Sequence, residues 1–561
     1  MKKYLIPFAF FLAACAGSKE ITYDTSTGNL LDFSNHIQSS FLKQHLEVIA
    51  HDSLEGRDTA SRGLKVAANY LAEFYTSLNF TPKGDDGSWF QNFELNATVT
   101  DSVVYTTFKI EEADTTTINH THITQFTSGD YFNSFGGSSS ASGNIIFAGF
   151  GVNDDNRGVY HLGDNEYNNS WILIFDDIPH VVDGDTLIHP SLNGNLRLGN
   201  ILRNTNANGI LLISDFSQQA FEEKASLEAK VATNPSGFSL PYLQTGRRSA
   251  GLPQGVHYIS PALAAEILEL SGTDELKSLY DSLIENIREF RAAETAFYLD
   301  YTPYSGPGTV QTDNVIAYLE GADSEMKHET LVLLAHYDHI GIGRPDASGD
   351  MIYNGADDNG SGTVALMAIA HALSEAKQAG FKPKRSILFL HVSAEEVGLL
   401  GSRYYSDHPV IPIENTIASF NADMIGRSDP ENIQTGDTDY VYLIGGEIIS
   451  SRLDSLIVVA NENSVNMRLD RKYNDLTDPN QFYRRSDHWN FGRLGVPFVF
   501  FFTGVHEDYH RPSDTVDKID FDKYTRVVQL IYASTIKVAN YDGHPEVDNQ
   551  EFIDITNRLA R

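Results

Sequence analysis

Histidine and carboxylate side chains recur along the second half of the chain, and several of them come where an apolar run stops. The set consists of His336, Asp338, Asp357, Asp358, Glu395, Glu396, Asp423 and His510. Imidazole and carboxylate together form a ligand set that suits Zn²⁺, whereas an all-oxygen set would suit Ca²⁺ or Mg²⁺. We therefore expect a zinc centre if the fold brings these residues together.

Each of these residues has an ordinary explanation when it is taken alone. The stretch NGADDNGSG, residues 354–362, has the composition of a tight turn, because Gly tolerates positive φ and Asx side chains bond their own backbone. Adjacent acids such as Glu395 and Glu396 are favoured at a helix start by the helix dipole. An aspartate at a strand end, such as Asp423, is often a cap. Their joint occurrence at successive strand ends is what favours a metal centre.

The spacing of His336 and Asp338 suits a ligand and its supporting acid. In an extended segment, residues two apart share a face, so Asp338 can accept the second imidazole N–H of His336 and fix its tautomer. The same alternation predicts that His339 points the opposite way.

Strand-like apolar runs alternate with helical runs from about Asp313 onward. The strand-like runs are NVIAYLEG, ETLVLLAHYDH, RSILFLHVSAEE, NTIASFNADMIG and PFVFFFTG, and helices are expected over residues 361–376 and 451–462. Such continuously apolar strands predict an α/β fold with a mixed, mostly parallel sheet covered by helices on both faces. In these sheets ligands gather at the carboxyl ends of the strands, where the candidate residues lie.

The first half of the chain has two other patterns. Helical spacing over residues 35–50 and 61–78 predicts two helices that pack on the sheet. From about Val99 to Ser260, short β-rich runs such as GNIIFAGFGV and ANGILLISDF are separated by Gly, Asn and Asp. This second pattern predicts a separate β-rich domain.

Composition limits the class of partner. The 561 residues, of which 41% are hydrophobic and 21% charged, indicate a globular chain of two or three structural units. The formal net charge of −34 would repel phosphate backbones. We therefore expect no nucleic-acid partner.

The first residues, MKKYLIPFAFFLAAC, predict export. Two lysines precede an apolar run that is too short to span a membrane, and small residues precede Cys15. LAAC resembles the bacterial lipobox, so Cys15 is the expected lipidation site and the lipid is the only expected membrane contact. We expect an exported lipoprotein of the cell envelope, and in a Gram-negative source Ala16, which is not Asp, points by the lipoprotein sorting rule to the outer membrane. Cys15 is the only cysteine, so the exported body has no disulfide.

A set of motifs in fixed order resembles the M28 family of di-zinc aminopeptidases over residues 313–541. The motifs are AHYDH, GADDNGSG, SAEEVGLLGS, NADMIGR, RRSDHWNF, GVPFVFFFTG and YHRPSDT. The stretch LEGRDTASRGLKVAANYLAEF is similar to the region before the catalytic core of that family. The β-rich segment is similar to its inserted protease-associated domain.

The resemblance implies the zinc exopeptidase fold and a division of the chain into six parts. These are a lipoprotein signal peptide (1–15), a tether (16–28), the first part of the peptidase domain (29–115), the protease-associated insertion (116–290), the catalytic domain (291–545) and a C-terminal tail (546–561).

Carried over residue by residue, the resemblance implies two Zn²⁺ ions per chain. His336 and Asp423 would hold one ion, Glu396 and His510 would hold the other, and Asp358 would bridge both.

The neighbours of these ligands would have supporting roles. Asp338 would support His336, and Asp357 would help the loop to keep its shape. Gly360 and Gly362 would let the backbone pass close to a crowded metal pair.

Glu395 would be the general base by the same resemblance. Two zinc ions about 4 Å apart lower the pKa of a shared water and polarise the scissile carbonyl, and Glu395 would move the water's proton to the leaving amine. Tyr509 and Arg485 would stabilise the tetrahedral intermediate, with Arg484 as the alternative to Arg485. The carboxylates would also accept a free α-amine, so peptides with free N-termini are the expected substrates of an aminopeptidase.

Three other functions fit parts of the sequence. HEDYH, residues 506–510, fits the H-E-x-x-H motif of a zincin endopeptidase, but it follows a strand-like run and Pro512 disfavours a helix there; His506 would then have a structural role. A glutaminyl-cyclase-like transferase would use a single zinc, whereas both His336 and Asp423 are present. A scaffold or binding protein with a decayed site is the non-enzymatic alternative, against which the intact ligand set argues.

Overall fold

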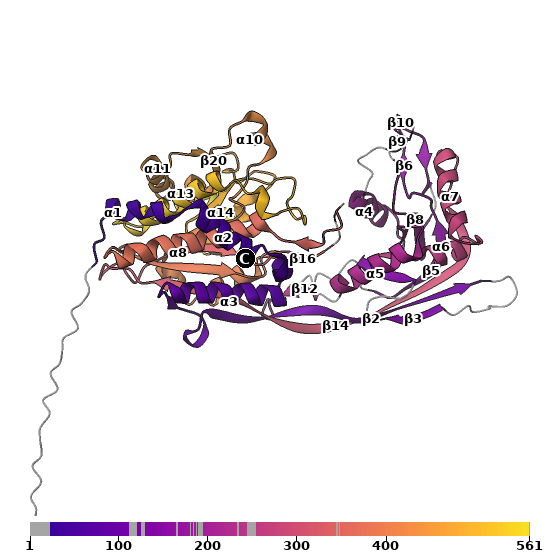
Figure 1. Ribbon diagram of the computed structural model, residues 1–561, viewed down its shortest axis with the longest axis horizontal. Coiled ribbons are helices and arrows are strands. Elements are labelled where there is room, and N and C mark those ends of the chain that lie inside the picture. The colour runs from indigo at the N-terminus through magenta and orange to yellow at the C-terminus, as the bar shows by residue number, and fades with distance from the viewer. Residues whose placement is uncertain are drawn as a thin grey trace, which may run out of the picture.

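Figure 1 shows the computed structural model of the chain, in which two lobes lie side by side. The structure describes residues 23–110, 120–124, 130–137, 139–163, 166–179, 181–182, 185–186, 188, 194–232, 235–243, 254–343, 346 and 348–559. The expected export signal and Cys15 therefore lie outside the described residues. No helix within the described ranges is long and apolar enough to cross a lipid bilayer.

The larger lobe is built on a mixed sheet with the strand order β21-β20-β22-β19-β15-β18-β14. Its strands are β14 (Ala293–Leu319), β15 (Thr330–His336), β18 (Ser386–Val392), β19 (Thr416–Ala422), β20 (Tyr440–Gly445), β21 (Arg468–Asp470) and β22 (Phe498–Phe502). The central strands β18, β15, β19 and β22 run parallel to one another. β14 and β20 pair with this group in the antiparallel direction. The predicted mixed, mostly parallel sheet is therefore confirmed.

Helices cover both faces of this sheet. One layer contains α2 (Ser39–Ile49), α3 (Arg62–Ser77), α8 (Gly362–Gln378), α11 (Ser451–Glu462) and α13 (Phe521–Ala539), and the other contains α9 (Leu400–Asp407) and α12 (Trp489–Gly492). Alternate side chains of each strand serve the two layers, since Leu331 and Leu333 of β15 belong to the first core and Val332 and Leu334 to the second. The four predicted helices correspond to α2, α3, α8 and α11.

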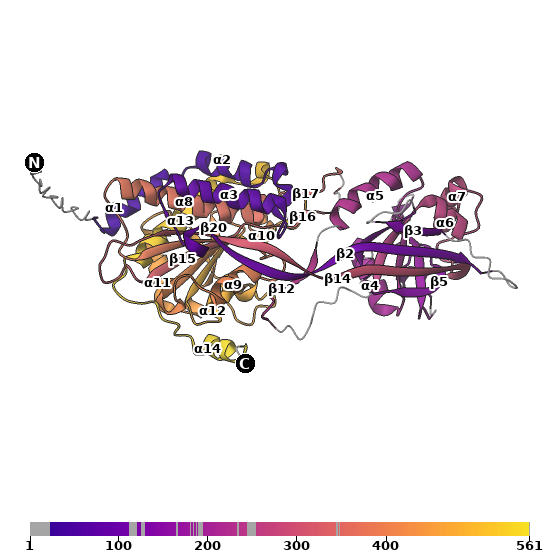
Figure 2. The same ribbon diagram turned by 90° about the horizontal axis from the view of Figure 1, so that it is seen from below.

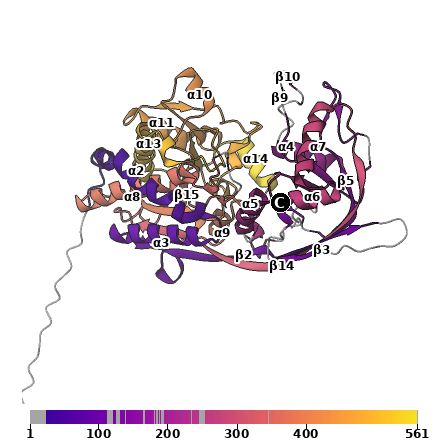
Figure 3. The ribbon, with the colours of Figure 1, turned by 45° about the vertical axis from the view of Figure 1, so that its right-hand side comes forward.

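The smaller lobe is an α/β unit. Its parallel strands β5 (Ala141–Phe147), β8 (Ser170–Phe175), β11 (Gly209–Ile213) and β13 (Gly255–Ile259) end in antiparallel β4 (Tyr131–Gly136). Helices α4 (Gly194–Asn204) and α5 (Gln218–Ala232) cover one face, and α6 (Pro261–Ile267) and α7 (Thr273–Glu285) cover the other (Figure 3).

The segment from about Val99 to Ser260 therefore contains more helix than the β-rich domain that the sequence predicted. The apolar residues of α4, Leu198, Ile201 and Leu202, have the helical spacing that buries one face.

Two long strands run through both lobes (Figure 2). β2 (Phe90–Lys109) pairs antiparallel with β14 from Phe90 opposite Val315 to Lys109 opposite Phe297. The core of the smaller lobe contains Val103 from β2 and Leu299 from β14. The smaller lobe therefore includes residues on both sides of the expected protease-associated insertion, residues 116–290.

Both ends of the described chain pack on the larger lobe. α1 (Thr27–Leu31) begins inside the expected tether and buries Leu30. α14 (Gln550–Leu559), within the expected tail, buries Phe552 against Ile449 and Phe498.

Candidate metal centre and active site

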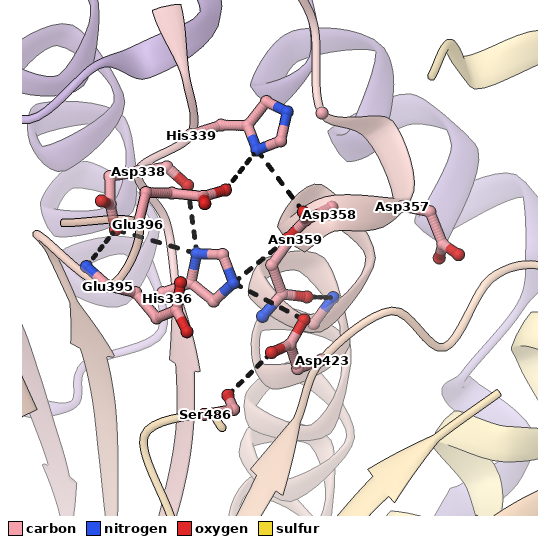
Figure 4. A network of polar contacts seen from close by, with 12 residues as sticks. His336, Asp338, His339, Asp357, Asp358, Asn359, Glu395, Glu396, Asp423 and Ser486 are labelled. Atoms are coloured by element: carbon pink, nitrogen blue, oxygen red, sulfur yellow. Dashed lines mark hydrogen bonds and ion pairs between the residues drawn. The ribbon is translucent and has the colours of Figure 1, made fainter. Parts of the chain in front are cut away.

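The carboxyl ends of three parallel strands bring the candidate residues to one edge of the sheet. His336 is the last residue of β15, Asp423 follows β19 directly, and Glu395 and Glu396 lie in the loop after β18. The predicted gathering of ligand-type side chains at strand ends is therefore present in the structure (Figure 4).

Asp358 lies between two groups of these side chains. It belongs to the single turn over Ala356–Ser361 that leads into α8. Its Oδ1 lies 3.3 Å from His336 Nε2, which in turn lies 3.5 Å from Asp423 Oδ1. Its Oδ2 lies 3.1 Å from His510 Nε2. One carboxylate therefore faces both sides of the cluster, each with a different oxygen.

The second group consists of Glu396, His510 and His339. The sequence had predicted that His339 would point the opposite way. His510 Nε2 lies 3.3 Å from Glu396 Oε2, and His339 Nδ1 lies 2.7 Å from Glu396 Oε1. The expectation that His339 points the opposite way from His336 is wrong. β15 ends at His336, so strict alternation no longer applies three residues later.

Asp338 supports the cluster in a different way from the one expected. His336 Nδ1 lies 3.1 Å from the backbone carbonyl oxygen of Asp338 and 3.7 Å from its carboxylate, so the carbonyl is the nearer acceptor. The carboxylate instead accepts the backbone N–H of Glu395 at 3.2 Å and the hydroxyl of Thr59 at 3.2 Å. Asp338 thereby fixes the backbone of Glu395, the first residue of the Glu395–Glu396 pair.

The charges of the cluster are set by burial and by close pairs. Burial raises the pKa of Glu395 well above its usual range, and the nearby charge of Glu396 adds to this. Burial would also raise the pKa of Asp358, but hydrogen bonds with His336 and His510 lower it well below its usual range. Although burial opposes it, the contacts with Asp358 and Glu396 raise the pKa of His510 to about 10. The cluster therefore favours a positive charge in contact with Asp358.

The neighbouring acid Asp357 points away from the cluster (Figure 4). Its Oδ1 accepts the backbone N–H of Gly426 at 2.6 Å, and its Oδ2 lies 3.3 Å from Nε2 of His506. Arg427 donates to the other ring nitrogen of His506 at 3.1 Å. His506 and His510 therefore face different partners, and the segment between them is a turn. The zincin alternative, which needs both histidines on one metal, does not fit this geometry.

Close backbone approach explains a glycine next to the cluster. A Cβ at Gly362 would lie 2.0 Å from the carbonyl oxygen of Ala422, which precedes the candidate ligand Asp423. Only glycine fits at this contact between the start of α8 and the end of β19.

Arg57 supports the site from a distant part of the sequence. Its buried guanidinium donates to the carbonyl oxygens of Tyr337, Asn354 and Gly355, which flank His336 and the turn that contains Asp358. The hydroxyl of Ser486 donates to Asp423 Oδ2 at 2.7 Å. Neither Arg57 nor Ser486 was identified as a supporting residue from the sequence. Both residues lie in motifs quoted above, LEGRDTASRG and RRSDHWNF, but their partners come from other strands and could not be read from spacing.

A pocket that is open to solvent lies beside the cluster. His336, Asp358, Glu395, Asp423 and His510 line its polar side, and Met424, Phe482, Phe500, Phe502 and Val505 line its apolar side. Tyr509 and Arg485 also line it. Arg484 instead donates to the side chain of Gln481, so Arg485 is the arginine that faces the pocket.

The donor set fits a pair of divalent cations. One ligand atom each from His336, Asp358 and Glu396, and one each from His336, Glu395 and Asp423, lie within 4.8 Å of one another. Nitrogen and carboxylate oxygen donors of this kind suit zinc.

The charge balance of the cluster agrees with this fit. Asp338, Asp358 and Asp423 are at most 7% exposed, and Glu395 and Glu396 lie beside them. Five crowded carboxylates exceed the charge that the neighbouring histidines can neutralise, so a cation would stabilise them.

Comparison with known proteins shows what the part of the chain that carries this site is similar to. The family model described as peptidase family M28 matches residues 314–535. A probable leucine aminopeptidase from Arthroderma otae is 27% identical over 283 residues, which cover 46% of this chain and 73% of that protein. Aminopeptidase YwaD from Bacillus subtilis is 26% identical over 229 residues, which cover 39% of this chain and 44% of that protein.

One solved structure matches most of the chain. BSAP, a zinc aminopeptidase from Bacillus subtilis, is 15% identical, with a TM-score of 0.48 and coverage of 91% of this chain and 98% of that one. All the ligand-type residues of the cluster lie within the segment that matches the family model. Residues 314–535 of this chain are therefore similar to peptidase family M28.

Proposed function

We propose that this chain is a zinc-dependent aminopeptidase that releases N-terminal residues from peptides. The observation that carries the proposal is the position of Asp358, whose two oxygens lie 3.3 Å from His336 Nε2 and 3.1 Å from His510 Nε2. A carboxylate with this placement can bridge two metal ions. The family match and the aminopeptidases among the related proteins support the same activity.

The contacts support a division of the proposed ligands between two sites. His336 and Asp423 would hold one zinc, since they are 3.5 Å apart, and Ser486 fixes the second oxygen of Asp423. Glu396 and His510, 3.3 Å apart, would hold the other, and Asp358 would serve both. His339 would orient Glu396 through its 2.7 Å contact. Zinc bound in these sites would lower the pKa of a water and polarise a carbonyl group.

Glu395 is placed to move protons. One of its oxygens lies within 4.8 Å of the ligand atoms of His336 and Asp423, and the side chain faces the pocket. A carboxylate in this position can take a proton from water and give it to the leaving amine. The backbone N–H of Glu395 is held by Asp338, so the position of this base is fixed.

The opposite side of the pocket binds and orients the substrate. Tyr509 and Arg485 line the pocket, and a hydroxyl and a guanidinium group can donate to the developing oxyanion. The carboxylates can accept the α-ammonium group of a peptide. Met424, Phe500 and Phe502 form an apolar wall, so an apolar N-terminal side chain would gain most by burial there.

Purified protein tests this proposal directly. We expect about two zinc ions per chain by metal analysis and release of N-terminal leucine or phenylalanine from short peptides. The same peptides with an acetylated N-terminus should not be cleaved, because the acetyl group removes the charge that the carboxylates bind. Equal cleavage of free and acetylated peptides would overturn the aminopeptidase assignment.

A further inference from the structure

A short segment of the smaller lobe returns to the larger lobe beside the candidate general base. We call residues 236–243 the strap. It begins with β12 (Ser236–Ser239), which pairs antiparallel with β2, with Ser236 opposite Thr98 and Ser239 opposite Asn96. Figures 1 and 2 place β12 where the two lobes meet. The strap therefore crosses from one lobe to the other.

Leu240 is the residue with which the strap enters the larger lobe. Its side chain is 0% exposed and shares an apolar cluster with Ala394 and Leu400 of the larger lobe. Phe93 and Leu95 of β2 complete the buried part of this cluster. Ala394 directly precedes Glu395, so the cluster that Leu240 joins reaches the residue before the proposed base.

The loop that Leu240 covers has an unusual backbone. We call residues 393–401 the base loop. Ala394 has φ of 56° and Leu399 has φ of 59°, so two residues other than glycine flank the Glu395–Glu396 pair in the left-handed region. Such conformations cost free energy and persist only where the surroundings hold them. The base loop therefore depends on its contacts.

The larger lobe holds the base loop from its own side. Asn314 accepts the backbone N–H of Ser393 at 3.2 Å and donates to the carbonyl oxygen of Gly401 at 3.0 Å. Asn490 donates to the carbonyl oxygen of Leu399 at 3.0 Å. The two asparagines fix the ends of the base loop, while Leu240 of the strap packs beside Ala394.

The strap has a second attachment just beyond the base loop. The hydroxyl of Tyr242 donates to Asp407 at 3.1 Å, and its ring packs edge-on against His408 with a centroid distance of 5.1 Å. Asp407 is the last residue of α9, which begins within the base loop. The strap thus holds both the base loop and the helix that follows it.

We propose that the strap is a positioning element for Glu395 and Glu396, so that the smaller lobe contributes to turnover through Leu240. This inference rests on the proposed function for its catalytic consequence. Loss of the Leu240 side chain would open a cavity in the apolar cluster that holds the left-handed backbone at Ala394. The carboxylates one and two residues later would then lose their fixed position relative to Asp358 and His336.

The test compares Leu240→Ala with Leu240→Met in the full chain. We expect Leu240→Ala to lower kcat on the order of 10- to 100-fold, because small misplacements of a reacting group are costly. KM should stay within about twofold, since the apolar wall of the pocket is untouched. Leu240→Met, which restores most of the volume, should recover most of kcat.

Hydrogen exchange gives a readout that does not depend on activity. In the base loop, the amide of Leu400 donates to Ala394 at 2.8 Å and the amide of Leu399 donates to Glu395 at 2.9 Å. Peptides that span residues 393–401 should exchange faster in Leu240→Ala than in the wild type. The variant should also lose zinc more readily to a chelator, because Glu396 lies in the same loop.

Leu212→Ala is the matched control, because Leu212 is equally buried but belongs to the core of the smaller lobe. It should leave the exchange of the base loop and kcat unchanged. Folded Leu240→Ala with wild-type exchange and wild-type kcat would overturn the proposal. If Leu240→Ala does not fold, Leu240→Val tests the same point with a smaller cavity. If the wild type releases no amino acids, the proposed function fails, and the exchange comparison still decides whether the strap holds the loop.

Discussion

Nε2 of His506 lies 3.3 Å from Oδ2 of Asp357, whose carboxylate points away from the candidate metal centre (Figure 4). His510, from the same segment as His506, and Asp358, the residue after Asp357, form a second contact of this kind. Nε2 of His510 lies 3.1 Å from Oδ2 of Asp358, inside the candidate metal centre. The same two segments therefore meet twice, once in a contact that supports the loop and once inside the candidate metal centre. This arrangement predicts that adjacent aspartates respond differently to substitution.

Asp357→Ala should destabilise the fold while zinc remains bound. The change leaves the buried N–H of Gly426 without its acceptor, which costs about 1–3 kcal/mol in the free energy of unfolding. Asp358→Ala should instead abolish zinc binding at one or both sites. Urea unfolding and metal analysis of both variants separate the two effects. Equal loss of zinc in both variants would contradict the different roles of the two acids.

Glu395→Gln should remove turnover and keep the metal. Glutamine has nearly the same shape but cannot take a proton, so kcat should fall by about 10²–10⁴-fold. Zinc content should match the wild type, since Glu395 is not among the proposed ligands. Glu375→Gln on the exposed side of α8 is the control and should behave as the wild type. Full activity of Glu395→Gln would exclude Glu395 as the base.

His510→Gln and His506→Gln test the zincin alternative. Because His510 contacts Asp358 and Glu396, its replacement should lower zinc affinity and activity together. His506 contacts Asp357 and Arg427, so its replacement should lower stability and leave the zinc content unchanged. Titration with a chelator measures the affinity in each case. The zincin alternative requires instead that both variants lose the metal.

Removal of the metal should lower the thermal stability of the chain. Without a cation, the buried carboxylates of Asp358, Asp423 and Glu396 repel one another. A free zinc concentration 100 times the dissociation constant would add about 2.7 kcal/mol to the free energy of unfolding. Scanning calorimetry with a chelator, and again after zinc is restored, measures this shift. Identical melting temperatures in both conditions would argue against a bound metal.

The buried residue Lys523, which is not among the proposed metal ligands, should make the free energy of unfolding depend on pH. Burial lowers the pKa of its ammonium group to about 7, and its Nζ lies 2.7 Å from Ser428 Oγ. An unfolded lysine keeps its proton up to pH about 10.4. Between these two values the unfolded chain binds the additional proton, so the contribution of Lys523 to the free energy of unfolding rises with pH.

Lys523→Met should remove this rise. Urea unfolding at pH 7 and pH 9 should show that the stability of the variant relative to the wild type falls as the pH increases. Lys43→Met, at an exposed position, is the control and should give the same difference at both pH values. A constant difference for Lys523→Met would show that the lysine does not titrate in this range.

Sequence reasoning predicted the elements of the larger lobe because their patterns are local. Continuous apolar runs predicted β15, β18, β19 and β22, and helical spacing predicted α3 and α11. Since parallel strands end at the same edge, the position of His336 and Asp423 followed from the same patterns. The metal-ligand set could therefore be proposed before the fold was known.

Contacts between distant segments could not be predicted in the same way. Arg57 reaches the loops around His336 through hydrogen bonds to carbonyl oxygens, and every peptide unit of a chain offers such an oxygen. The orientation of His339 depends on the residue at which β15 ends, because side chains alternate between faces only within the strand. The sequence does not give that end to within one residue. The helices of the smaller lobe were missed because short strands and Gly-rich turns dominate the composition of that segment.

The pairing of β2 with β14 has a consequence for the order of folding. Phe90 pairs with Val315, although the whole smaller lobe lies between them in the sequence. Closure of so long a loop is entropically costly, and contacts of high sequence separation form slowly. The smaller lobe must therefore become compact before the ladder can close along its full length. Nascent chains released before β14 would expose the unpaired edge of β2, the surface on which strands of other molecules can add.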